Sequence, residues 1–278
     1  MIQALVRREM VLQLSVSLLP ARSTASRTPD VAVVIDVLRA TSVMAVALQA
    51  GVKEIITCRD VQQATDLAGT LTPRPLLCGE RQCRAISGFD LGNSPAEYTP
   101  TVVAGRSMVM TTTNGTAAIN ATGTVPRVIT ASFLNFSAAA QWLRGADHVQ
   151  LVCAGTNGQI TGEDTLLAGG LADFCVQRFS ALLANDEAIL ARQFWRSWFS
   201  IEPLPTVAAL ADRLRETQGG RNLQQVGYQD DLLRCAAIDS VPLVPQRVQD
   251  SPAVFRSSVS KPKEPKPKGT HHFRDVGG

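Results

Sequence analysis

The sequence predicts a three-layer α/β/α protein with a mostly parallel or mixed sheet, a helical C-terminal part and a disordered basic tail. Short apolar runs rich in β-branched residues alternate with helix-like segments along the chain. The first such run, residues 31–36, is apolar until its last residue, as is typical of a strand covered on both faces. With 278 residues, 45% of them hydrophobic, the chain is long enough to bury a sizeable core.

The predicted elements follow one another from residue 31 onward. We expect strands over residues 31–36, 53–57, 76–78, 107–111, 127–130, 148–153 and 241–244. Helices are expected after most of these strands, over residues 41–50, 60–71, 115–121, 137–143 and 163–179. Beyond residue 180 the pattern becomes helical alone, over residues 186–199, 207–216 and 223–237. The spacing of leucines and aromatic residues there indicates core packing.

The charge distribution divides the chain into a body, residues 1–245, and a tail, residues 246–278. Of the body, the first 30 residues are the least clearly assigned. The tail holds seven Lys and Arg against three Asp and Glu, so its net charge of +4 exceeds the net charge of +3 of the whole chain. Its segment 261–268 alternates lysine with proline and cannot build a core, which predicts an extended, disordered tail. Neither aromatic stacking residues nor a recognition helix accompany it, which argues against a nucleic-acid partner.

The composition excludes several kinds of chemistry. Lys53 is the only lysine before Lys261, so a Schiff-base enzyme or a P-loop has almost no candidate residue. Two of the three histidines lie in the tail, and the six cysteines lack ligand spacing and predict buried free thiols. The remaining carboxylates, hydroxyls and amides suit Mg²⁺ better than a softer ion.

No segment predicts attachment to a membrane. No apolar stretch reaches the roughly 18 residues that a membrane span needs. Residues 10–20 are too polar for a signal peptide and are not followed by a convincing cleavage site. We therefore expect a cytoplasmic protein without a membrane partner.

The most informative motif begins where the first strand ends. Asp36 closes the apolar run, and Arg39, Thr41 and Ser42 follow at the start of the next helix. Because ligands of open α/β sheets bind at the carboxyl ends of strands, Asp36 could hold a cation while the other three hold an oxyanion. The alternative is that Asp36 only caps the turn and Arg39 pairs with it.

Similar polar groups follow the later strands. They comprise Glu80, Arg81, Asn93, Ser94, Thr113, Asn114, Gly115, Ser132, Asn135, Glu163 and Asp164. Capped turns explain some of them, and acidic residues in the first turn of a helix are also favoured by the helix dipole. Taken together, the strand ends nevertheless deliver polar side chains to one edge of the sheet.

These blocks resemble, in order, those of the 2-phosphosulfolactate phosphatase family. The resemblance extends from about residue 30 to residue 245 and includes residues 36–42, 79–81, 88–95, 111–116, 132–135, 153–155, 163–164 and 219–223. The family is understood as magnesium-dependent phosphatases that release phosphate from 2-phospho-3-sulfolactate, a step toward coenzyme M. The resemblance thus implies a hydrolase of phosphoric monoesters that acts on a small anionic phosphorylated hydroxy acid.

The resemblance and the residues together imply a mechanism. Asp36, Glu80 and Asp164 would hold Mg²⁺, and Asp36, Arg39 and Glu163 would be catalytic, with Glu163 orienting the attacking water. The residues expected to bind phosphate or substrate are Thr41, Ser42, Arg81, Asn93, Ser94, Thr113, Asn114, Gly115, Ser132, Asn135 and Arg221. Three alternatives stay open: Asp36 as a covalent nucleophile, another 2-hydroxy-acid phosphate as substrate, and a non-catalytic module that binds a phosphometabolite. The sequence also leaves a homo-oligomer open.

Overall fold

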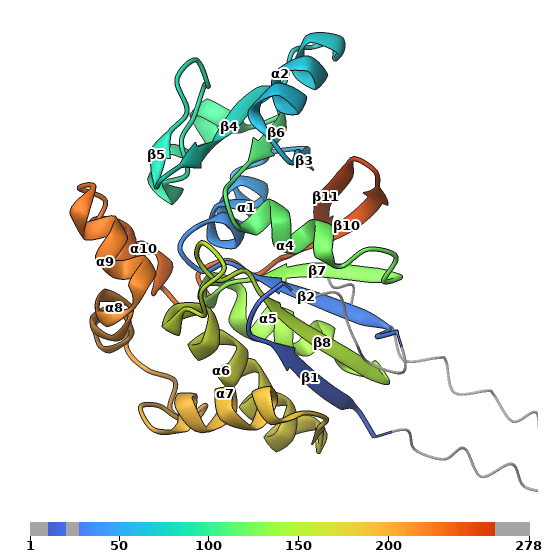
Figure 1. Ribbon diagram of the computed structural model, residues 1–278, viewed down its shortest axis with the longest axis vertical. Helices are drawn as coiled ribbons and strands as arrows, with labels where there is room; N and C mark the ends of the chain where they lie inside the picture. The colour runs from blue at the N-terminus through green and yellow to red at the C-terminus, as the bar shows by residue number, and fades with distance from the viewer. Residues whose placement is uncertain (1–10, 21–27, 259–278) are drawn as a thin grey trace, which may run out of the picture.

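A computed structural model describes residues 11–20 and 28–258 and places one mixed sheet between helices on both sides, which confirms the predicted fold class (Figure 1). The strands are β1 (Gln13–Ser17), β2 (Val31–Ile35), β3 (Glu54–Thr57), β4 (Leu76–Arg81), β5 (Arg84–Ala85), β6 (Ser107–Thr111), β7 (Arg127–Ala131), β8 (His148–Cys153), β9 (Leu182–Leu183), β10 (Val244–Asp250) and β11 (Ala253–Ser258). The α-helices are α1 (Ala40–Gln49), α2 (Val61–Thr70), α3 (Pro100–Val103), α4 (Gly115–Ala121), α5 (Phe136–Trp142), α6 (Gly162–Phe179), α7 (Asp186–Arg196), α8 (Val207–Glu216), α9 (Gln218–Gln225) and α10 (Asp230–Cys235). Two 3-10 helices, η1 (Pro95–Glu97) and η2 (Phe133–Asn135), complete the set.

The sheet consists of two parallel groups of strands joined by an antiparallel hairpin. Its order in the described residues is β5-β4-β6-β3-β11-β10-β7-β2-β8-β1-β9. Strands β4, β6 and β3 are parallel to one another, and so are β7, β2, β8, β1 and β9. The chain passes from the second group to the first through α1 and returns through α4. The carboxyl ends of β2 and β6 therefore lie where the chain changes direction, which is where open α/β sheets bind ligands.

The hairpin of β10 and β11 corrects the predicted start of the tail. β10 pairs with β7 and β11 pairs with β3, so residues 244–258 belong to the middle of the sheet. β10 carries mostly polar residues, which is why the sequence favoured a tail from residue 246 and placed a strand at 241–244. The buried residues Ala253, Val254 and Phe255 hold β11 against the core. Residues 259–278, the remainder of the predicted tail, lie outside the described residues.

Strand β2 positions the candidate site because it is packed on both faces. All five of its residues are buried. Val31, Val33 and Ile35 contact the hydrophobic cluster on one side of the sheet, whereas Ala32 and Val34 contact the cluster on the other. This alternation is the period of two that a strand imposes. The loop that begins at residue 36 is therefore held on a rigid support.

Two further regions differ from the sequence-based prediction. Strand β1, which was not predicted, alternates exposed and buried residues and pairs in parallel with β8. The helix expected over residues 223–237 is two helices, α9 and α10, separated near Gly227, which has a φ of 85°. In the described part of the chain, no helix has the length and apolar character needed to cross a membrane.

Candidate functional site

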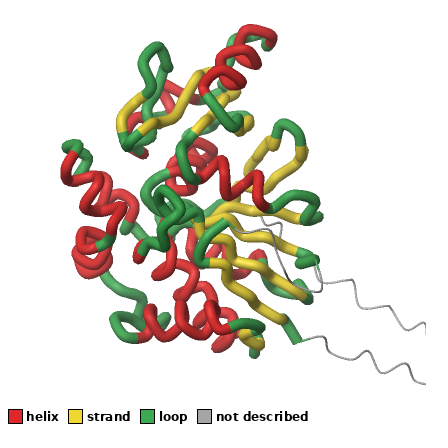
Figure 2. The backbone as a smooth tube through the Cα atoms, viewed as in Figure 1, coloured by secondary structure: helices red, strands yellow, loops and turns green. Residues whose placement is uncertain are grey.

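The loops at the carboxyl ends of the parallel strands enclose a small cavity, here called the central cavity. The volume of the central cavity is about 30 Å³. Figure 2 shows these loops gathered beside the ends of the strands. The cavity is lined by Asp36, Leu38, Arg39, Glu80, Cys83, Asn93, Asn114, Thr156, Gly219 and Asn222. Five residues predicted from sequence, namely Asp36, Arg39, Glu80, Asn93 and Asn114, are thus brought together.

Asp36 is fixed by the first turn of α1. Its Oδ1 accepts a hydrogen bond from the amide of Ala40 at 3.1 Å, and its carbonyl accepts one from the amide of Thr41 at 3.0 Å. Burial raises the pKa of Asp36 to about 7, opposed by the Ala40 hydrogen bond and assisted by the charges of Glu80 and Glu163. A side chain at Gly115 would place its Cβ 2.8 Å from Asp36 Oδ2, so only glycine lets α4 approach this carboxylate. The amides of Ala40 and Thr41 at the start of α1 were expected to bind an anion, but both already donate hydrogen bonds to Asp36.

Two more carboxylates lie close to Asp36 at the start of α6. Asp164 accepts hydrogen bonds from the amides of Val37 at 2.9 Å and Gly155 at 3.0 Å, which ties the loop after β2 to the loop after β8. Burial, followed by the charges of Glu163 and Asp36, raises the pKa of Asp164 well above its usual value. Burial also raises the pKa of Glu163. Three buried acids with raised pKa values therefore share one small region.

Glu163 and Asn93 each have a buried side-chain oxygen that lacks a hydrogen-bond partner. These atoms are Glu163 Oε2 and Asn93 Oδ1. A Cβ at Gly219 would lie 2.2 Å from Glu163 Oε1, so α9 closes directly over this carboxylate. Buried acceptors without partners are uncommon and mark places where a ligand, water or ion could supply the missing contact.

Two of the three predicted metal ligands bind backbone amides. Both oxygens of Glu80 accept amide hydrogen bonds, from Cys83 and Thr113 at 2.8 Å each, just as both oxygens of Asp164 accept amides. Within residues 11–20 and 28–258, no group of three or more His, Cys, Asp or Glu side chains is arranged to hold a metal ion. Glu80 and Asp164 therefore help to organise loops, and their role as metal ligands beside Asp36 stays a prediction.

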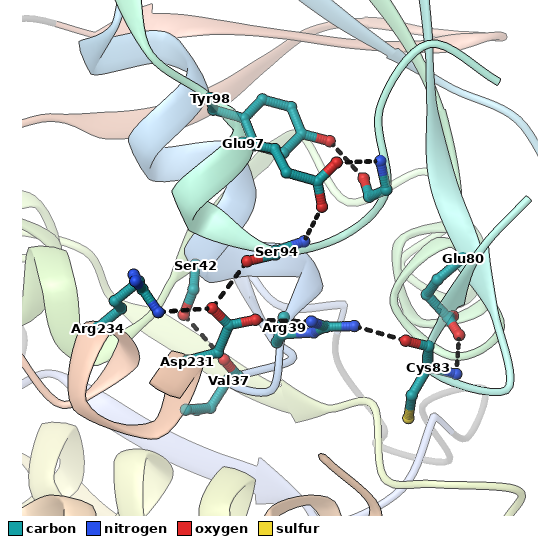
Figure 3. Close-up of polar contacts among 11 residues, drawn as sticks. Val37, Arg39, Ser42, Glu80, Cys83, Ser94, Glu97, Tyr98, Asp231 and Arg234 are labelled. Atoms are coloured by element: carbon teal, nitrogen blue, oxygen red, sulfur yellow. Dashed lines mark hydrogen bonds and ion pairs between the residues drawn. The ribbon is translucent and has the colours of Figure 1, made fainter. Parts of the chain in front are cut away.

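Arg39 is buried and contacted from several sides (Figure 3). Its Nη1 lies 2.6 Å from Oδ2 of Asp231, and its Nη2 donates to the carbonyl of Cys83 at 2.9 Å. The ring of Tyr228 lies beneath the guanidinium, 4.4 Å from its centre. Asp231 and Tyr228 were missed by sequence reasoning, which interpreted the C-terminal helices as core packing. The acidic residues in the first turn of α10 were the only local feature of the sequence that could have indicated a role of this helix in the site.

The predicted hydroxyl groups donate within the protein. Thr41 Oγ1 donates to the carbonyl of Asp36, and Ser42 Oγ donates to the carbonyl of Val37, both at 2.8 Å. Ser94 Oγ donates to Asp231 Oδ1, also at 2.8 Å. These hydroxyls therefore stabilise the loops around the central cavity, and a ligand could use only their lone pairs.

Ser132 and Asn135 were expected to bind substrate, and their position contradicts this. Both are fully buried, and they cap η2 reciprocally, with the Ser132 amide donating to Asn135 Oδ1 at 2.8 Å. The Asn135 amide group donates to the carbonyl of Leu243 at 3.1 Å. Neither residue lines the central cavity. They connect β7 to the segment before β10. A short motif cannot distinguish Ser and Asn residues that cap a turn from those that bind a ligand.

Three further predicted residues, Arg81, Thr113 and Arg221, do not line the central cavity. Arg81 contacts Thr111 through its guanidinium, at 3.0 Å to Oγ1. Thr113 and Asn114 line a neighbouring cavity of about 240 Å³. Arg221 lines a larger cleft of about 700 Å³, here called the outer cleft, whose wall also includes Thr156 and Asn222 of the central cavity. Thr156, Asn222 and Cys83 were not predicted, although Thr156 follows a strand end as the other site residues do.

Comparisons with known proteins give one consistent family. The model of the 2-phosphosulpholactate phosphatase family matches residues 17–250. A probable 2-phosphosulfolactate phosphatase of Synechococcus sp. (strain RCC307) is 39% identical over 248 residues, which cover 86% of this chain and 97% of that protein. Proteins with the same printed name from Parasynechococcus marenigrum (strain WH8102) and Symbiobacterium thermophilum are each 38% identical, covering 86% and 83% of this chain and 96% and 95% of their own lengths.

Proposed function

Because this chain belongs to the 2-phosphosulfolactate phosphatase family, we propose that it hydrolyses 2-phospho-3-sulfolactate to 3-sulfolactate and phosphate. The family makes the chain a phosphoric monoester hydrolase that acts on a small phosphorylated compound. The observation that carries the proposal is the central cavity, where Asp36 and Arg39 meet at the carboxyl edge of the sheet. A place in coenzyme M formation is a further prediction of the same resemblance.

Phosphoryl transfer mainly requires in-line attack and neutralisation of the oxyanion, and the residues of the central cavity could supply both. Arg39 has five N–H donors, of which Asp231 and Cys83 take two, so others remain for a phosphoryl oxygen. Glu163 does not line the central cavity, but its charge acts on Asp36, and it carries an unpartnered oxygen that could orient the attacking water. In the metal-free protein Asp36 has a pKa of about 7 and can hold a proton near neutral pH, which a bound cation would displace.

The donor set fits Mg²⁺ held by few protein ligands. Magnesium is commonly bound through one or two carboxylates, substrate phosphate and water. We propose Asp36 as the principal ligand, together with the unpartnered oxygen of Asn93, which lines the same cavity, and that of Glu163, whose charge acts on Asp36. The ion would supply Lewis-acid polarisation of a phosphoryl oxygen. It would also neutralise carboxylates whose pKa values are raised by burial and mutual repulsion.

The outer cleft suits the organic part of the substrate. A phosphate, a carboxylate and a sulfonate together carry about four negative charges, which arginine forks bind well. Arg221 lies in the wall of the outer cleft, and Thr156 and Asn222 line both the cleft and the central cavity. We therefore propose that Arg221 contacts the sulfonate or the carboxylate when the phosphate occupies the central cavity.

Phosphate release from a panel of esters tests the function. The purified full chain is assayed with 2-phospho-3-sulfolactate, phospholactate and phosphoglycolate, with Mg²⁺ and with EDTA. We expect the highest kcat/KM for the sulfonated ester and loss of turnover in EDTA. Equal turnover of phospholactate would overturn the substrate assignment alone. Calorimetric binding of the esters without any phosphate release would favour the non-catalytic module.

A further inference from the structure

A buried ion pair links the C-terminal helix α10 to the arginine of the central cavity (Figure 3). Arg39 begins the segment that leads into α1, whereas Asp231 lies 192 residues later in the first turn of α10. Each side chain is only 2% exposed, and the two charged groups are 2.6 Å apart. The contact therefore joins two walls of the site that are far apart in sequence.

The surroundings of Arg39 restrict how its guanidinium can lie. Asp231 accepts from Nη1, the carbonyl of Cys83 accepts from Nη2, and Tyr228 covers one face of the planar group. A planar fork that is fixed at both Nη atoms and on one face has little freedom to rotate. Its unused N–H groups consequently point in directions set by these three contacts.

Asp231 is itself held in place by the loop before α3. Its Oδ1 accepts from Ser94 Oγ at 2.8 Å, and Ser94 in turn forms a capping box with Glu97. The carboxylate of Glu97 accepts from the amide of Gly92 at 2.6 Å. Arg234, one turn further along α10, lies 3.5 Å from Asp231 and is half-exposed. The carboxylate that orients Arg39 is thus anchored independently of Arg39.

We infer that Asp231 is a positioning residue for the phosphatase reaction: it holds the guanidinium of Arg39 in the orientation that binds the phosphoryl oxygens. This inference rests on the proposed function. A buried ion pair contributes little net stability, because desolvation of both charges offsets their attraction, so stability alone does not account for it. Because Arg39 lines the central cavity and Asp231 does not, Asp231 acts through Arg39.

A second buried carboxylate provides a matched control. Asp173 in α6 is fully buried and binds Arg192 of α7 at 2.8 Å, away from the residues that line the central cavity. Asp231→Ala should lower kcat at least about 30-fold with less than a threefold change in KM. Asp173→Ala should lower Tm but leave kcat and KM of the folded protein unchanged. If both variants kept wild-type kcat, Asp231 would be merely structural.

Chemical rescue gives a readout that a structural role would not move. In Arg39→Ala, added methylguanidinium should occupy the vacated space between Asp231, Cys83 and Tyr228 and restore activity at least about tenfold. The same ion should not rescue Arg39→Ala/Asp231→Asn, whereas Arg39→Ala/Asp173→Asn should be rescued like the single variant. Equal rescue in both double variants would overturn the inference.

The two proposals fail in distinguishable ways. Loss of phosphate release in the wild-type chain would remove the proposed function itself. A wild-type chain that is active, combined with Asp231→Asn and Ser94→Ala variants of unchanged kcat, would remove only the positioning role. Ser94→Ala keeps every charge and removes one hydrogen bond to Asp231, so it remains informative if the Asp231 variants do not fold.

Discussion

Two groups of buried charges lie in or beside the central cavity, which Asp36 and Arg39 line, and they are built in opposite ways. The acidic group, Asp36, Glu163 and Asp164, places like charges close together, and burial raises all three pKa values. The paired group, Arg39 and Asp231, combines opposite charges at 2.6 Å. The acidic group holds like charges that a cation would neutralise, whereas the paired group already combines its two opposite charges within the protein.

This difference assigns separate tasks to the two groups. Buried carboxylates with raised pKa values gain most from a divalent ion, because the ion offsets both their mutual repulsion and the cost of burying their charges. A guanidinium that is already paired gains little from further charge but retains directed N–H donors. We therefore expect the acidic group to control metal dependence and the paired group to control the geometry of phosphate binding.

The largest expected effect is that of Asp36→Asn. Losing the principal carboxylate should lower kcat/KM by about 10³-fold or more, which corresponds to roughly 4 kcal/mol in the barrier. The amide can still accept from Ala40, so far-UV circular dichroism should be unchanged. Asp60→Asn is the control, because Asp60 caps α2 on the surface and its replacement should leave kcat/KM intact. Full activity of Asp36→Asn would break the distinction between the two groups.

Arg39→Lys tests the paired group and should have the next largest effect on kcat/KM. A lysine cannot reproduce the fork that binds Asp231 and Cys83 together, so kcat/KM should fall by about 10²-fold, nearly as far as in Arg39→Ala. The Mg²⁺ concentration for half-maximal activity should stay near the wild-type value. Steady-state kinetics across a Mg²⁺ titration checks both statements. A lysine variant with near wild-type kcat/KM would reduce Arg39 to a simple positive charge.

The sequence was sufficient to predict the side of the site that comes from strand ends. The apolar run of β2 and the polar residues after it predicted both the strand and the place of Asp36, since strand ends converge by topology. The sequence could not predict that Asp231 and Tyr228 contact Arg39, because contacts across about 190 residues leave no local pattern. Nor could it show that Glu80 and Asp164 bind backbone amides, which depends on loop conformations.

The same reasoning explains the errors in the fold. Strand β8 is buried along its whole length and mostly apolar, and it was predicted with correct ends. β10 is mainly polar, and β1 was considered only as a leader segment. Their places depend on pairing with distant strands rather than on their own composition. Local pattern thus identified the buried strands and missed those fixed by tertiary pairing.

The stability of the metal-free protein should depend on pH through the acidic group. The folded-state pKa of Asp36 is raised from 3.8 to about 7, so the folded protein binds this proton more tightly than the unfolded chain. The contribution to the free energy of unfolding is therefore greatest at low pH and is lost as pH rises through about 7. Relative to Asp36→Asn, we expect wild type to lose on the order of 4 kcal/mol between pH 4 and pH 8 in EDTA.

Urea unfolding at several pH values, with EDTA and with Mg²⁺, measures this loss. Saturating Mg²⁺ should restore the wild-type free energy of unfolding at pH 8 and have little effect on Asp36→Asn. Asp231→Asn should show the same response to Mg²⁺ as wild type. A Mg²⁺ response in Asp36→Asn as large as in wild type would mean that the ion binds elsewhere.

The smallest expected effect distinguishes a hydroxyl that supports a loop from one that binds phosphate. Thr41 Oγ1 donates to the carbonyl of Asp36 and accepts from its amide at 3.2 Å. Thr41→Val removes both contacts with little change in shape, so the free energy of unfolding should fall by about 1 kcal/mol. Because Asp36 keeps its Ala40 contact, kcat should fall less than fivefold and KM should not change. A KM increase above tenfold without loss of stability would instead place Thr41 among the phosphate ligands. The loop that carries Asp36 would then contribute to substrate binding as well.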